Sequence, residues 1–237
     1  KSYKPSDIIT SHKGLTVEIT NTDAEGSLAL CDVLSYVQKK YSPENIIDLA
    51  TLTGACMVAL GKGSAGLFTN KYNKLAEELI SASKEVDEPV WHLPINDEHR
   101  EDMKSKVADL RNAGKNRYGG ASKGAAFLES FIDKERSWVH LDIAGPAMGA
   151  AGASGYGTQL VLKYLYNYTH GTDVKEQDSQ GTFVTGNDTL GLSIKQEVEF
   201  DIENKKQETE DKDATEVNSQ INRKPSASFV YTYTSSE

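Results

Sequence analysis

The chain has 237 residues, of which 38% are hydrophobic and 26% charged, and its formal net charge at pH 7 is −9. This length and composition allow one sizeable core with an appendage. No segment shows the clustered Lys and Arg with interleaved aromatic residues that nucleic-acid surfaces need, and no stretch approaches the roughly 18 apolar residues of a membrane span. We therefore expect neither a nucleic acid nor a membrane as a partner.

The predicted elements alternate between strands and helices. Residues 14–20 alternate apolar and polar side chains like a half-buried strand, and residues 45–53 and 137–144 are compact and apolar like interior strands. Helical spacing of apolar residues predicts four helices, at residues 27–41, 73–86, 123–133 and 157–168. Such alternation favours an α/β fold, a three-layer α/β/α sandwich with a mostly parallel sheet, over residues 1–170.

Residues 171–237 differ from this body in charge and in polar composition. They carry 14 acidic against 7 basic residues, whereas residues 1–170 carry 21 against 19. Their polar composition predicts an extended, non-globular, acidic tail. Two β-prone patches, residues 182–194 and 226–234, could each add a strand to an exposed sheet edge, and we expect them to dock on other chains.

The two cysteines, Cys31 and Cys56, both lie in apolar stretches. A disulfide framework is therefore not expected, and a reducing, cytoplasmic location fits. The G-x-G-x-x-G pattern at residues 61–66 precedes an apolar stretch rather than a helix, which disfavours a dinucleotide site.

Ligands of α/β sheets bind where strands end. Asp23, residues 51–54 and residues 144–147 each follow a predicted strand, so three segments should meet at one edge of the sheet. An Asp-x-Glu pair before a helix most often serves as a cap and a partner of the helix dipole. Here the strand delivers Asp23 and the turn lets Glu25 reach the same point, and carboxylate oxygens are ligands of divalent cations.

The stretch "NTDAEG" (21–26), which runs into the helix at Leu28, resembles the signature N-T-D-A-E-G-R-L of the leucyl aminopeptidases, the two-metal cytosol aminopeptidase family. Further segments resemble family segments in the same order: residues 5–14, 48–55, 66–70, 108–114, 117–121, 125–128 and 140–145. The resemblance spans about residues 3–169 and implies the later part of the catalytic domain.

The resemblance also implies site residues. Two divalent metals, zinc or manganese, would be expected, with Asp23 binding one metal and Glu25 shared by both. The pocket for the substrate's amino group and first side chain would be lined by Thr51, Leu52, Gly54 and Ala144. The family further implies an oligomer with identical or related chains.

Two departures weaken these implications. Ser27 stands where the signature has an arginine that holds an anion, and a serine has neither the charge nor the bidentate fork, so no catalytic residue is assigned. The family's remaining ligands, a lysine and two aspartates, belong with a V-G-K-G-x-x-F-D-x-G-G motif that does not occur in these 237 residues and that we expect upstream of Lys1. Weak metal binding or none is expected of this chain.

Two hypotheses remain. The favoured one is a non-catalytic, leucyl-aminopeptidase-like structural subunit of a larger cytoplasmic assembly, cytoskeletal or other, held through body and tail. The alternative is a metal-dependent leucyl aminopeptidase that removes N-terminal residues from peptides once the upstream ligands are supplied. Ser27 favours the first hypothesis, and the intact Asp23 and Glu25 favour the second.

Overall fold

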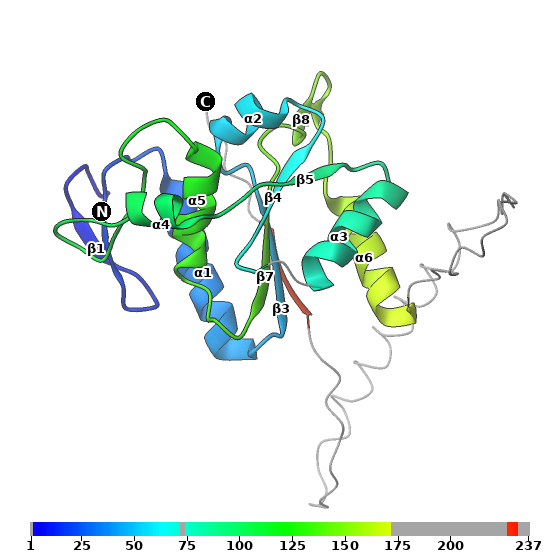
Figure 1. Cartoon of the computed structure of the whole chain (residues 1–237), viewed down its shortest axis with the longest axis horizontal. Helices are drawn as coiled ribbons and strands as arrows, with labels where there is room; N and C mark the ends of the chain where they lie inside the picture. The colour runs from blue at the N-terminus through cyan, green and yellow to red at the C-terminus, as the bar shows by residue number, and fades with distance from the viewer. Residues whose placement is uncertain (1, 72–73, 172–226, 232–237) are drawn as a thin grey trace, which may run out of the picture. The chain divides into compact units, whose positions relative to one another are not determined.

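The computed structural model describes residues 2–71, 74–171 and 227–231. Its centre is a five-stranded sheet with the order β10-β3-β7-β4-β5 (Figure 1). The strands of this sheet are β3 (Asn45–Ala50), β4 (Ala65–Thr69), β5 (Val90–His92), β7 (Ser137–Asp142) and β10 (Ala227–Tyr231).

The sheet is mostly parallel, as predicted, but two strands run against the others. β10, β3 and β7 are parallel, whereas β4 is antiparallel to β7 and carries β5 parallel to itself. The reason lies in the connection between β3 and β4, which contains only the seven-residue helix α2 (Gly54–Leu60). A helix of about 10 Å cannot run back along a strand of about 20 Å, so β4 begins near the edge where β3 ends.

Helices cover both faces of the sheet. α1 (Glu25–Tyr41) and α5 (Gly120–Glu129) lie on one face, and α3 (Lys74–Glu85) and α6 (Thr158–His170) on the other (Figure 1). Successive residues of β3 serve the two faces, because side chains alternate along a strand: Ile46 packs into the core cluster with α1 and α5, and Ile47 into the cluster with α3 and α6. The structure is thus a three-layer α/β/α arrangement.

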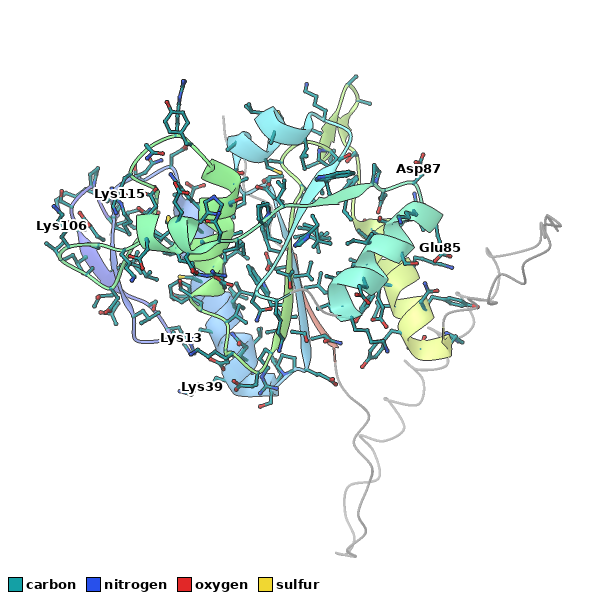
Figure 2. All side chains as sticks on the ribbon, in the orientation of Figure 1. Lys13, Lys39, Glu85, Asp87, Lys106 and Lys115 are labelled. Carbon is teal, nitrogen blue, oxygen red and sulfur yellow. The ribbon has the colours of Figure 1, made fainter. Side chains whose placement is uncertain are left out.

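Smaller elements surround this body. β1 (Ile8–Thr10), β2 (Thr16–Glu18) and β6 (Leu110–Arg111) form a second sheet, and β8 (Met148–Gly149) pairs with β9 (Gly152–Ala153). The short helix α4 (Asp97–Asp102) precedes β6. Charged side chains such as Lys39, Glu85 and Lys106 point outward from the periphery of the body (Figure 2).

One buried polar network lies in the middle of the central sheet. The Asp48 carboxylate on β3 accepts a hydrogen bond from Trp138 Nε1 (2.7 Å) and lies 2.5 Å from His140 Nδ1, and all three side chains have no exposed surface. Burial alone would lower the pKa of His140, but the adjacent Asp48 raises it. His140 is therefore a strand residue with a local partner.

The predicted tail contributes one described element. Residues 227–231, inside the patch 226–234, form β10 on the edge of the chain's own sheet, beside β3. We expected this patch to dock on other chains, and in the structure the strand joins the body of the same chain instead. The patch at residues 182–194 lies outside the described residues.

Candidate functional site

The turn that carries Asp23 and Glu25 is held by a buried amide. Asn112, which follows β6 and is 3% exposed, accepts hydrogen bonds through Oδ1 from the backbone N–H of Thr20 (2.8 Å) and of Asn21 (3.2 Å). Its Nδ2 donates to the carbonyl oxygen of Asn21 (2.6 Å). The start of the turn is therefore fixed by a side chain from a distant segment, and β2 leads into α1 along a defined path.

Both carboxylates of this turn face solvent at the start of α1. Glu25 is the first residue of the helix, where the helix dipole is positive, and Asp23 precedes it with its N–H donated to Asn21 Oδ1 (3.1 Å). Among the residues that the structure describes, neither carboxylate makes a hydrogen bond or an ion pair with another side chain. Both are thus free to bind a ligand.

The ends of β3 and β7 bring two further segments to the same place. Ala50 and Asp142, the last residues of these strands, are paired in register, so the segments that begin at Thr51 and at Ile143 leave the sheet side by side. The first continues into α2, whose N-cap is Thr53, with Oγ1 accepting the N–H of Cys56 (3.1 Å). Two of the three segments predicted to meet at one sheet edge therefore do so, whereas the third, which carries Asp23, follows β2 of the separate β1-β2-β6 sheet.

These segments surround one cavity of about 350 Å³. All six residues predicted from the sequence line it: Asp23, Glu25, Thr51, Leu52, Gly54 and Ala144. Ser27 lines it as well, although only 7% of this residue is exposed. The structure places the predicted residues together, and the roles given to them remain predictions.

Sequence reasoning missed three larger side chains of the cavity, namely Met57, Lys62 and Met148. Met57 lies on α2, whose seven residues are too few to show a helical period. Lys62 lies within the glycine-rich pattern that was weighed only as a nucleotide motif. Met148 begins the β8–β9 hairpin, and only its short distance from Ala144 in the sequence could have indicated a place at the site.

The described part of the chain offers no further metal centre and no membrane-spanning helix. It contains no group of three or more His, Cys, Asp or Glu side chains that could hold a metal ion. Within the same residues, no helix combines the length and the apolar character that crossing a bilayer requires.

Comparison with known proteins gives one consistent result. Residues 1–162 match the catalytic domain of the cytosol aminopeptidase family. The chain is 49% identical over 173 residues to a probable cytosol aminopeptidase of Chloroherpeton thalassium, covering 70% of this chain and 34% of the relative. It is 51% identical over 174 residues to the corresponding protein of Chlorobaculum tepidum, covering 71% and 34%.

A solved structure agrees with these sequence matches. The K354E mutant of tomato leucine aminopeptidase superposes with a TM-score of 0.66 at 45% sequence identity, covering 69% of this chain and 32% of the tomato chain. The present chain thus spans about a third of the length of the relatives that it matches. With its matching residues, its mixed α/β sheet and its cavity at the strand ends, the chain belongs to the cytosol aminopeptidase family.

Proposed function

We propose that the cavity binds the N-terminal residue of a peptide and takes part in metal-dependent removal of that residue. The observation that carries the proposal is the convergence of five residues on one cavity with Ala144, namely Asp23, Glu25, Thr51, Leu52 and Gly54. Carboxylates that can bind a cation therefore line the same small cavity as the segment whose backbone would bind an amino group. Its volume of about 350 Å³ suits a single amino-acid residue at the end of a chain.

The lining of the cavity supports an apolar first side chain. Leu52, Met57 and Met148 supply apolar surface, and the flexible thioethers of methionine adapt to side chains of different shape. In this proposal the carbonyl oxygen of Leu52 accepts a hydrogen bond from the substrate's amino group. Leucine and similar residues are the expected first residues.

The donor chemistry of the cavity fits a divalent cation in part. Asp23 and Glu25 are exposed to the cavity and have no competing partner within the described residues, and hard or borderline cations such as manganese and zinc bind carboxylate oxygens. Two carboxylates do not complete a coordination shell, so weak binding remains the expectation for these residues alone. A bound metal would act as a Lewis acid and lower the pKa of a bound water.

The chain's own residues would then position the substrate. The negative charges of Asp23 and Glu25 lie in the cavity. In the proposal, the backbone of Thr51, Leu52, Gly54 and Ala144 orients the substrate's amino group and first side chain. Ser27 cannot perform the role of the arginine found in the family signature, so no group on this chain is assigned to proton transfer from the attacking water.

The catalytic alternative is now better supported than the scaffold hypothesis. The two bacterial relatives carry the name aminopeptidase, and no comparison indicates a structural role. Ser27 is the single observation that still favours a non-catalytic subunit. Assembly with related chains, docking through the patch at residues 182–194 and a location in the cytosol belong to the proposal as expectations.

Hydrolysis of leucine 7-amido-4-methylcoumarin by the full-length protein, with manganese or zinc added, tests the proposal. We expect activity that a chelator abolishes and that Glu25→Gln lowers at least about 100-fold, because a carboxylate shared by the cations is lost. Glu77→Gln, at an exposed glutamate of α3, is the matched control and should leave the rate unchanged. Ser27→Arg should raise the rate if the missing arginine limits proton transfer.

No hydrolysis by the wild-type protein with either metal, and none after Ser27→Arg, would overturn the proposal. In that case a sedimentation measurement that shows a defined oligomer would favour the structural subunit instead.

A further inference from the structure

Asp142 is a buried carboxylate directly behind the cavity. It is the last residue of β7, has no exposed surface, and is paired in register with Ala50 on one side and with Gly66 of β4 on the other. The segment that leaves β3 therefore starts next to Asp142, and the segment that leaves β7 starts directly after it. Asp142 itself is not among the residues that line the cavity.

Both segments are hydrogen bonded to this one side chain. Oδ1 accepts the backbone N–H of Leu52 (3.2 Å) and, more weakly, that of Thr53 (3.4 Å) from the segment after β3. The same oxygen accepts the N–H of Ala144 (3.2 Å) from the segment after β7. Oδ2 accepts the hydroxyl of Thr53 (2.6 Å), which also caps α2.

These contacts explain why a carboxylate can occupy the position. Burial raises the pKa of Asp142, whereas His140 and the hydrogen bonds from Thr53 and Ala144 act in the opposite direction. An apolar side chain of similar size would avoid the burial of a charge but would leave the three N–H groups without this acceptor. The segments after β3 and after β7 would then no longer be hydrogen bonded to the same side chain, which sets the distance between them.

We propose that Asp142 is a positioning residue that holds Leu52 and Ala144 at a fixed separation and so sets the width of the site for the substrate's N-terminal residue. The inference rests on the proposed function in that Leu52 and Ala144 are taken to contact the substrate. Asp142 touches neither substrate nor metal and acts through the two segments. Among the described groups that donate to the carboxylate of Asp142, only the hydroxyl of Thr53 belongs to a side chain, so it can be removed by a substitution.

The role of Asp142 predicts an effect on substrate binding that is larger than the effect on turnover. Thr53→Val removes the hydroxyl while keeping the shape, and it should raise KM for the leucine coumarin amide about tenfold, the loss that one hydrogen bond to a charged group causes, with a smaller change in kcat. Thr53→Ser keeps the hydroxyl and should restore the wild-type KM. Asp142→Asn keeps an acceptor for the N–H groups and should give an intermediate KM.

A matched control separates positioning from the loss of a helix cap, because Thr53 also caps α2. Asn96 caps α4 with Oδ1 accepting the N–H of His99 (3.1 Å), and α4 contributes no residue to the cavity. Asn96→Ala should lower thermal stability like Thr53→Val but leave KM unchanged. An equal KM for wild type and Thr53→Val would overturn the inference while the proposed function stands.

If neither the wild-type protein nor Ser27→Arg hydrolyses the substrate, the proposed function fails and binding decides the inference. L-leucine is then titrated into the wild-type protein and both Thr53 variants by calorimetry. About tenfold weaker binding to Thr53→Val than to Thr53→Ser would support positioning by Asp142. Equal binding to the two variants, or no binding to the wild type, would overturn it.

Discussion

Lys123 of α5 and Asp102 of α4 form an ion pair of 2.6 Å between Nζ and Oδ2, with side chains only 8% and 14% exposed. Lys123 Nζ also donates to Asn116 Oδ1 (2.8 Å), and Asp102 Oδ2 accepts the N–H of Lys115 (3.1 Å). A largely buried charge pair thus joins α4 and α5.

Removal of one member of this pair should cost more than removal of both charges. Lys123→Met leaves the Asp102 carboxylate without its partner and should lower the free energy of unfolding by about 3 kcal/mol. Lys123→Met combined with Asp102→Asn should be less destabilised than Lys123→Met alone, and therefore less than the sum of the single variants. Urea unfolding in a double-mutant cycle measures the coupling, and a coupling near zero would mean that the pair does not stabilise the fold.

The same pair predicts a pH dependence. Burial acts to raise the pKa of Asp102, but the hydrogen bonds and charges of Lys123 and Lys115 together outweigh it, and the pKa lies below its usual range. Because the folded pKa is lowered, this stabilisation is present above about pH 4, the ordinary pKa of Asp, and is lost as the pH falls through the folded pKa. Asp102→Asn should therefore narrow the difference in unfolding free energy between neutral and acidic pH.

A close backbone contact should make Gly145 intolerant of a side chain. A Cβ atom on Gly145 would lie 2.2 Å from the carbonyl oxygen of Gly61, which is nearer than non-bonded atoms approach. Gly145→Ala should force the segment after β7 away from the segment after α2, at about 1–3 kcal/mol of unfolding free energy, and should displace the adjacent Ala144.

Gly63 provides the control for this substitution. A Cβ on Gly63 would meet no atom within 4 Å, so Gly63→Ala should change the unfolding free energy by no more than about 0.5 kcal/mol. Both variants are compared by chemical denaturation. Equal stability of Gly145→Ala and Gly63→Ala would show that the two segments move apart without cost.

Both thiols should be inert in the folded protein. Burial, with the charge of Asp32 beside Cys31 and of Asp142 beside Cys56, raises the pKa of each thiol to about 12, and the two side chains are 2% and 1% exposed. Almost no thiolate is present at pH 8, so reaction with a thiol reagent should be slow until guanidinium chloride unfolds the chain. Rapid reaction of the native protein, assigned with Cys31→Ala and Cys56→Ala, would contradict this.

Because the pKa of each thiol is raised in the fold, the protein should lose stability at alkaline pH. In the unfolded chain a cysteine ionises near pH 8.5, whereas in the fold it stays protonated to a higher pH. The contribution of the thiols to stability is therefore complete below about pH 8.5 and is lost as the pH rises above it.

The long periodic elements could be predicted from the sequence because packing and pattern agree there. The helix expected at residues 27–41 begins at Glu25, and the one expected at 73–86 spans Lys74–Glu85. The strands expected at 45–53 and 137–144 end at Ala50 and Asp142, where the site segments begin. The helix expected at 123–133 instead covers Gly120–Glu129, since its glycine-rich first turn gives no apolar signal.

The elements that were missed depend on tertiary contacts. α2 exposes 88% of Val58, so its apolar residues follow no buried face. The five residues of β4 are all buried and therefore show no alternation. The direction of β4 depends on the length of the α2 connection and not on its own residues. At the site, the resemblance identified the residues at the cavity, but the hydrogen bonds of Asp142 and Asn112 join segments about 90 residues apart and leave no local pattern.

The last prediction concerns charge at the cavity and the choice of substrate. Lys62 is the one cationic side chain among the described residues that line the cavity, and it follows the Gly61 that ends α2. An ammonium group at this position repels a positively charged first residue by about 1 kcal/mol at 4 Å in water. Lys62→Glu reverses the sign and should raise kcat/KM for an arginine substrate relative to a leucine substrate by about tenfold, an effect that added salt reduces. Lys106→Glu, at an exposed lysine outside the cavity, should leave the ratio unchanged, and an equal ratio in both variants would place the substrate's first side chain away from Lys62.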